Sequence, residues 1–158
     1  MTATTAPFLI RAPAAPDREA WARLWEDYLW FYDTRLPAAQ FDLQFARLLS
    51  DDPRGFRGLM AFRGTEALGL AHYVFHPHGW QAGDTCYLQD LWTSASARGQ
   101  GIGRALIAAV GQAAQAQGAV QVYWLTHSGN AVARALYDKV GRATGFVEYE
   151  LGSGTTAS

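Results

Sequence analysis

The chain has 158 residues, of which 49% are hydrophobic and 17% charged, a composition typical of one globular domain and unlike that of a disordered chain. Its formal net charge of −1 gives no general attraction to nucleic acid or to an anionic membrane surface, and no apolar run reaches the ~18 residues of a membrane span. A single cysteine, Cys86, excludes an internal disulfide, and the N-terminus has no signal-peptide pattern, so we expect a cytoplasmic protein.

The first half of the sequence predicts one strand, two helices and three more strands. An apolar stretch at 7–12 is the first strand candidate, and prolines end it. Apolar residues then recur at helical spacing as far as Tyr32, with Asp17 as the expected N-cap, and Pro37 opens a second helix. A strand meander follows at 58–62, 67–75 and 85–93.

The second half predicts helices and strands in alternation. Apolar residues at helical spacing begin at Ile102, and Asn130 is the expected N-cap of a later helix. Short apolar runs predict two further strands, at 120–126 and 146–151.

These elements favour an α+β sandwich. We expect a mixed, mostly antiparallel sheet of six to seven strands flanked by about four helices. The sequence contains no linker or internal repeat, so we expect a single domain over residues 1–151 and a flexible tail at 152–158.

Three glycines stand between the 85–93 strand and the following helix, in the stretch ARGQGIGRAL. The first turn of a helix has backbone N–H groups without partners and lies at the positive end of the helix dipole, so such a loop is typical of an anion site. Glycines let a phosphate approach the backbone, and Arg98 and Arg104 can add charge-assisted hydrogen bonds. A Walker loop is excluded because Arg104 stands where its lysine would. A Rossmann fingerprint is excluded because its third glycine and its acidic residue are missing.

The same stretch resembles the R/Q-x-x-G-x-G/A segment of the GNAT superfamily of N-acetyltransferases, with Arg98, Gly101 and Gly103 at its fixed positions. YLQDLWT before the loop resembles the central strand of that family, NAVARALYDKVG its later cofactor helix, and GFVEY the strand that ends its fold. These motifs are most similar to the diamine and histone-type acetyltransferase branch. The resemblance implies a GNAT-like acyl-CoA N-acyltransferase fold with acetyl-CoA as cosubstrate, its pyrophosphate on the glycine loop and its pantetheine arm along the 85–93 strand.

The resemblance also implies which residues bind and which react. Tyr137 is the candidate general acid, because a phenol is protonated at neutral pH and can donate to the departing thiolate. Gln89 and Asp90 are the other candidate catalytic residues, although strand alternation is expected to place them on opposite faces of the sheet. A structural hydrogen-bonding role for Asp90 is an equal alternative. Gln89 stands where the branch often has Glu, and an amide cannot take a proton. Two routes to a neutral amine therefore stay open: a water chain that carries the proton to a carboxylate elsewhere, or binding of an amine that is already neutral. The implied cofactor contacts are Leu91, Trp92, Thr93, Arg98, Gly99, Gln100, Gly101, Ile102, Gly103, Arg104, Asn130 and Tyr137.

Residues 17–33 hold five acidic and two basic side chains beside exposed-looking aromatic rings. Acidic and aromatic side chains together suit a cationic amine, and an ordinary solvated helix face is the competing interpretation. A polyamine, a lysine-like amino acid, a protein lysine or an aminoglycoside are all compatible acceptors. The candidate substrate residues are Glu26, Asp27, Trp30 and His127.

We therefore expect a homodimeric enzyme that moves the acetyl group of acetyl-CoA to a small-molecule or peptide amine by direct attack. A catalytically weak acetyl-CoA sensor is the alternative, motivated by Gln89, and an interaction module that uses the aromatic first helix is a third hypothesis. The histidines of HYVFHPH do not predict a metal site, because Pro77 and strand alternation separate them and no cysteine or carboxylate pattern completes a ligand set.

Overall fold

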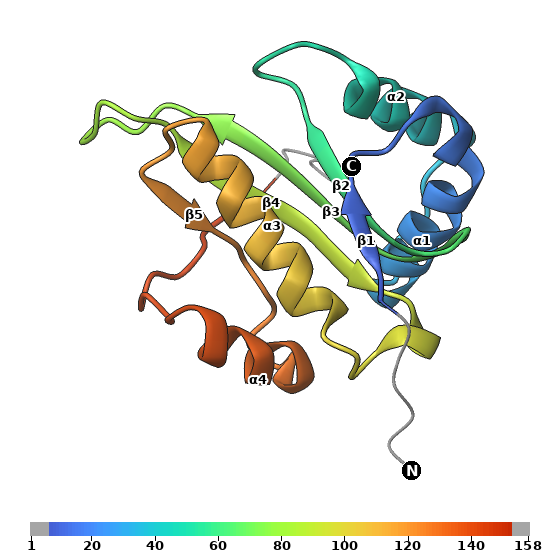
Figure 1. Cartoon of the computed structure of the whole chain (residues 1–158). Helices are drawn as coiled ribbons and strands as arrows, with labels where there is room; N and C mark the ends of the chain where they lie inside the picture. Colours follow the sequence, from blue (N-terminus) through green and yellow to red (C-terminus); the bar gives the residue numbers. More distant parts are fainter. Residues whose placement is uncertain (1–6, 153–158) are drawn as a thin grey trace, which may run out of the picture. The chain divides into compact units, whose positions relative to one another are not determined.

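The computed structural model describes residues 7–152, which form two units (Figure 1). The first unit extends to Leu125 and the second begins at Thr126. The first unit comprises β1 (Leu9–Arg11), a 3₁₀ turn η1 (Ala15–Asp17), α1 (Arg18–Phe31), α2 (Ala38–Leu49), β2 (Arg57–Arg63), β3 (Glu66–His76), β4 (Thr85–Thr93), a 3₁₀ turn η2 (Ala95–Ala97), α3 (Ile102–Ala116) and β5 (Gln121–Tyr123). The second unit contains α4 (Ala131–Val140). No helix of the described part is both long enough and apolar enough to cross a membrane.

The strands of the first unit form one sheet in the order β1-β2-β3-β4-β5. The first four strands pair antiparallel with their neighbours, and β5 runs parallel to β4. A mixed, mostly antiparallel sheet is therefore confirmed. The expected count of six to seven strands is too high, because the described residues form a sheet of five.

The two faces of this sheet are covered by different helices (Figure 1). Leu70 of β3 packs in an apolar cluster with α1 and α2. A Cβ on the neighbouring Gly69 would instead meet Ile102 and Leu106 of α3 at 3.1 and 3.2 Å. Because neighbouring residues of a strand point to opposite faces, α1 and α2 cover one face and α3 the other. Gly69 leaves the room that α3 needs to pack closely.

The apolar cluster on the α1 face is rich in aromatic rings. Trp21 and Trp25, one helical turn apart on α1, stack with their ring centroids 5.1 Å apart, and Phe45 of α2 lies 5.0 Å from Trp21. Each buried ring of this size removes ~150–250 Å² from water, which fixes both helices to the sheet. The buried members are Trp21, Leu24, Trp25, Leu29, Phe45, Leu48, Met60, Phe62 and Leu70.

Asp17 stands immediately before α1, but its side chain does not cap the helix as expected. Its Oδ2 accepts a hydrogen bond from the backbone N–H of Ala14 at 2.7 Å and pairs with the Arg11 guanidinium at 2.6 Å. The hydrogen bond from Arg11 lowers the pKa of the Asp17 carboxyl. Since η1 leads directly into α1, this carboxylate turns back toward the preceding chain.

A β-bulge interrupts the pairing of β3 with β4 at the middle of β4. His72 lies opposite Asp90 and the next residue, Tyr73, lies opposite Leu88, so Gln89 is an extra residue with no partner on β3. A bulge breaks the alternation of side chains along a strand. The expectation that Gln89 and Asp90 face opposite sides is therefore wrong at this point, as the pocket described below shows.

The pairing of β4 with β5 covers only one end of β4. Thr85–Tyr87 pair with Gln121–Tyr123, which is shorter than the strand expected at 120–126. Within the described first unit, the backbone of β4 from Leu88 to Thr93 thus has a strand partner on its β3 side only. No strand of the first unit pairs with the backbone N–H and C=O groups of its other edge.

The second unit is built around α4. Asn130 caps this helix as expected, because its side chain accepts from the backbone N–H of Ala133 at 3.4 Å. The strand expected at 146–151 is absent, and Phe146 and Tyr149 are 89% and 90% exposed. A strand needs a neighbour to satisfy its backbone, so apolar side chains alone do not form one. Of the expected tail, residues 153–158 lie outside the described residues.

Candidate active site

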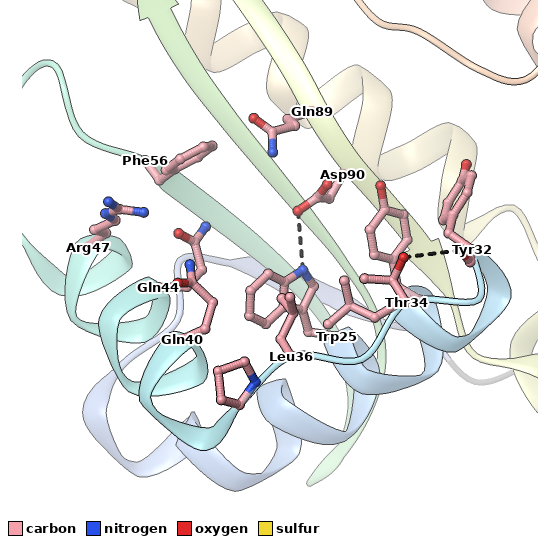
Figure 2. Close-up of a pocket in the computed structure, with 13 residues that line it drawn as sticks. Trp25, Tyr32, Thr34, Leu36, Gln40, Gln44, Arg47, Phe56, Gln89 and Asp90 are labelled. Atoms are coloured by element: carbon pink, nitrogen blue, oxygen red, sulfur yellow. Dashed lines mark hydrogen bonds between the residues drawn. The ribbon is translucent and has the colours of Figure 1, made fainter. Parts of the chain in front are cut away.

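The carboxylate of Asp90 is the centre of a buried hydrogen-bond network that joins β4 to α1 and β3. Its Oδ2 accepts from the Trp25 indole N–H at 3.2 Å and lies 2.8 Å from Nδ1 of His72 (Figure 2 shows the Trp25 bond). The Trp21 indole N–H donates to Nε2 of the same imidazole at 2.8 Å. Because an indole nitrogen only donates, Nε2 of His72 must accept. The proton of His72 therefore lies on Nδ1, which donates to Asp90, and the ring is neutral.

Burial and the Asp90 carboxylate raise the pKa of two tyrosines, one within α1 and one at its C-terminal end. Burial raises the pKa of Tyr28 strongly, and the negative charge of Asp90 with its hydrogen bond to the phenol raises it further. Burial and the same charge also raise the pKa of Tyr32. Both phenols are therefore protonated at neutral pH, so they are hydrogen-bond donors and not bases.

A pocket of about 430 Å³ opens beside this network, between α1, α2 and β4 (Figure 2). We call it the β4 pocket. Its volume is that of a small-molecule site. Both Gln89 and Asp90 line it, since the bulge brings the two consecutive side chains to one side of the strand. The lining residues are Trp25, Tyr28, Leu29, Tyr32, Thr34, Leu36, Pro37, Gln40, Gln44, Arg47, Phe56, Gln89 and Asp90.

The glycine loop leads into α3 with two residues in the left-handed region of the backbone. Gly99 has φ +73° and Gly101, the N-cap of α3, has φ +82°. A side chain would be strained at either position, although no atom of the described residues beyond the adjacent ones lies within 4 Å of the Cβ position. Gln100 between them accepts from Arg63 at 2.7 Å and donates to the carbonyl of Ser96 at 3.1 Å, which fixes the loop.

These residues fit the pyrophosphate and pantetheine of acetyl-CoA. The first turn of α3 offers backbone N–H groups beside the open space at Gly99 and Gly101. The Arg98 guanidinium stacks 4.9 Å from the ring centroid of Trp92, which holds a cation at the start of the loop. The buried indole N–H of Trp92 finds no acceptor in the described part of the chain. The open edge of β4 at Leu91–Thr93 supplies further backbone groups.

The predicted substrate residues of α1 do not line the β4 pocket. Glu26 and Asp27 are exposed on α1 and are absent from the pocket lining. Trp30 is 51% exposed, with the Arg35 guanidinium 3.5 Å from its ring centroid. Their role toward an acceptor stays a prediction.

Three of the predicted site residues belong to the second unit. Asn130 uses its side-chain oxygen to cap α4 and donates from its amide to the Thr126 hydroxyl at 3.3 Å. Tyr137 is partly buried on α4. His127 is exposed, and its Nδ1 accepts from the backbone N–H of Gly129 at 3.0 Å. The roles of these side chains toward cofactor or substrate stay predictions.

The histidines of HYVFHPH separate in the structure. His72 is bound within the network at Asp90, His76 lies 3.0 Å from the Tyr123 hydroxyl, and His78 packs against the ring of Trp80. Among residues 7–152 no three His, Cys, Asp or Glu side chains gather closely enough to hold a metal ion.

Comparison with known proteins decides the family. The model of the acetyltransferase (GNAT) family matches residues 20–141, which is most of the chain. The chain belongs to this family. The GNAT chain also resembles a curated enzyme, the D-amino-acid N-acetyltransferase HPA3 of Saccharomyces cerevisiae, with 35% identity over 144 residues that cover 90% of this chain and 89% of that protein. It is thus an acetyl-CoA-dependent N-acetyltransferase, as the sequence predicts.

Solved structures show the same fold. A transcriptional regulator from Bacillus halodurans C-125 has a TM-score of 0.79 at 22% identity, with 92% of this chain and 99% of that chain covered. AAC(6')-Iy in complex with the bisubstrate analog CoA-S-monomethyl-acetylneamine has a TM-score of 0.79 at 18% identity, with 94% and 99% covered. At these identities the likeness concerns the fold, and it confirms a GNAT fold for this acetyltransferase.

Several residues of the site are not found by sequence reasoning. His72 and Tyr28 lie within apolar patterns of the sequence. Those patterns predict that His72 packs as part of a strand and Tyr28 as part of a helix. Gln44 and Arg47 lie on α2, which shows only an amphipathic pattern in the sequence. The one available signal is chemical, since a polar residue such as His72 on a buried strand needs a partner. The sequence alone does not provide the strand register that places Asp90 opposite it.

Replacement of Gly101 by Asp tests the loop. The change places a negative carboxylate where the pyrophosphate of acetyl-CoA is expected to bind. We expect the acetyl-CoA affinity measured by calorimetry to fall about 10- to 100-fold, the range for losing charge-assisted hydrogen bonds. Gly118→Asp is the matched control, because Gly118 also has a left-handed φ, of +72°, with open space around its Cβ position. Equal affinities of the two variants would contradict the assignment of the loop.

Proposed function

We propose that this acetyltransferase transfers the acetyl group directly to a primary amine of a small acceptor bound in the β4 pocket. The observation that carries the proposal is the position of Gln89 and Asp90 together on the pocket wall. Direct attack is favoured because the one cysteine offers no nucleophile for a covalent acyl-enzyme. Cys86 is fully buried and burial raises the pKa of its thiol to about 11, so the thiolate is scarce at neutral pH.

The residues of β4 prepare the amine. The negative charge of Asp90 attracts an ammonium group into the pocket, where burial makes the interaction stronger than in water. Gln89 cannot take a proton, and we assign it the role of holding a water that passes the amine proton to Asp90. This arrangement supplies a base through a carboxylate although the side chain at position 89 is an amide.

The transfer itself breaks one bond and forms one. The thioester supplies the acetyl group, and the open β4 edge at Leu91 offers a backbone N–H to the carbonyl oxygen as its charge grows. The lone pair of the amine nitrogen forms the bond to the carbonyl carbon, and the carbon–sulfur bond breaks with its electron pair on sulfur. The nitrogen loses one further proton to water as the amide forms. Tyr137 is the proposed donor of the proton that the sulfur takes up, and its phenol then regains a proton from water.

A free amino acid is the acceptor class we favour. The curated relative HPA3 is by name a D-amino-acid N-acetyltransferase, and a pocket of about 430 Å³ accommodates an acceptor of that size. A lysine-like amino acid belongs to this class, and a polyamine, a protein lysine and an aminoglycoside are the acceptors tested against it. Exposed Glu26 and Asp27, with Trp30 and His127, are proposed to attract and contact the cationic acceptor outside the pocket lining.

Replacing Glu26 and Asp27 by their amides tests this role. The double variant should show a higher KM for a diamine than the wild type, and an unchanged KM would contradict the role.

We also propose that the enzyme acts in the cytoplasm as a homodimer. One buried cysteine and no disulfide within residues 7–152 suit a reducing compartment. The dimer is tested by light scattering, in which the mass of a single chain at working concentration would contradict it.

A panel of amines tests the proposed function. Thiol release from acetyl-CoA is followed in the presence of D- and L-amino acids, a diamine, an aminoglycoside and a lysine peptide, and mass spectrometry identifies the product. We expect amine-dependent release, fastest with a free amino acid. The buried Cys86 does not add a protein thiol to the signal of the native enzyme. Tight binding of acetyl-CoA without release for any amine would instead support the acetyl-CoA sensor that Gln89 suggests.

Tyr137→Phe tests the general acid. Loss of the hydroxyl should lower kcat by ~10²-fold, the usual size of general-acid catalysis, and leave acetyl-CoA affinity unchanged. Tyr149→Phe is the control, because it removes a phenol that is 90% exposed in the same unit. An unchanged kcat in Tyr137→Phe, measured by rapid quench so that product release does not limit the rate, would assign Tyr137 a packing role.

A further inference from the structure

The β4 pocket contains one charged residue of each sign. Of the thirteen residues that line it, only Asp90 and Arg47 are charged. Asp90 comes from β4, whereas Arg47 comes from the last turn of α2. In Figure 2 the two side chains approach the pocket from these separate elements, with Gln40 and Gln44 of α2 beside them. A cavity with this arrangement complements a molecule that carries both a positive and a negative group.

The polar groups on the α2 side have no partner within the described chain. The exposed side chain of Arg47 forms no ion pair or hydrogen bond with any residue of 7–152. Gln44 is only 4% exposed and lines the pocket, yet its amide makes no hydrogen bond there either. Although most of the Gln44 side chain is buried, its amide atoms border the cavity and are available to a ligand there. Gln40, Gln44 and Arg47 share one face of α2, because they are four and three residues apart.

We propose that Arg47 binds the carboxylate of the acceptor and makes this enzyme selective for amino acids over amines without a carboxylate. The inference rests on the proposed function and adds the residue that selects the substrate. The planar guanidinium binds a carboxylate through two parallel N–H···O bonds, and the Gln44 amide donates a further one. The amine of the same molecule then faces Gln89 and Asp90. A diamine lacks the anionic group and places a second cation in a pocket that already contains Arg47.

The carboxylate of the acceptor does not change charge during acetyl transfer. Its contact with Arg47 is therefore equally strong in the bound substrate and in the transition state. Loss of such an interaction raises KM and leaves kcat unchanged. This separates Arg47 from the proposed catalytic residues of β4, whose loss lowers kcat.

The test compares lysine with cadaverine, which is lysine without its carboxylate, in the wild-type enzyme and in Arg47→Gln. We expect kcat/KM for lysine to fall ~10- to 100-fold through KM in the variant, the range for a charge-assisted hydrogen bond to a carboxylate, while kcat/KM for cadaverine does not fall. Arg47→Lys keeps the charge without the planar fork and should retain part of the activity with lysine. Arg54→Gln removes an exposed charge outside the pocket and should match the wild type.

The outcomes separate the inference from the proposed function. If the wild type turns over lysine and Arg47→Gln leaves its KM unchanged, the inference is overturned and the proposed function stands. The inference is also overturned if Arg47→Gln lowers kcat/KM equally for lysine and cadaverine, or if the wild type has the higher kcat/KM for cadaverine. If the wild type acetylates no amine, both fall.

Discussion

The buried carboxylate of Asp90 is the constraint on which the rest of the site depends. A charge removed from water costs several kcal/mol unless hydrogen bonds compensate it. Here the indole of Trp25 and the imidazole of His72 donate to it, and Trp21 fixes the imidazole in turn. These hydrogen bonds form only if α1 packs against β3 and β4 in one fixed position. The same hydrogen bonds that stabilise the charged carboxylate therefore also position the wall of the β4 pocket.

In the proposed function one strand, β4, contributes to the sites of both substrates. The bulge at Gln89 brings two consecutive side chains of β4 to the pocket on the α1 face. Beyond Tyr87 the other edge of β4 has no strand partner in the first unit, which leaves backbone groups for the cosubstrate. The glycine loop follows the strand closely, so the proposed phosphate site, the backbone edge of β4 and two residues of the β4 pocket all lie between Gln89 and Arg104. This accounts for the concentration of sequence signal between residues 85 and 104.

The parts of the account that the sequence predicts are those governed by local physics. The glycine loop before α3, the cap at Asn130 and the apolar stripe of α1 each depend on a few neighbouring residues, and all three are present. The parts it does not predict depend on distant partners. A bulge changes which side Gln89 faces, Arg47 and Gln44 meet β4 only through the packing of α2, and the apolar residues at 146–151 do not form a strand without a neighbouring edge.

The hydrogen-bond state of His72 gives the most direct test of the central claim, that a neutral imidazole holds the Asp90 carboxylate in place at the β4 pocket. NMR of the ring nitrogens in isotopically labelled enzyme at neutral pH distinguishes the two tautomers and the doubly protonated ring. The account predicts a neutral ring with its proton on Nδ1 and a bare Nε2 that accepts from Trp21. A proton on Nε2, in either the other tautomer or the imidazolium, would contradict it.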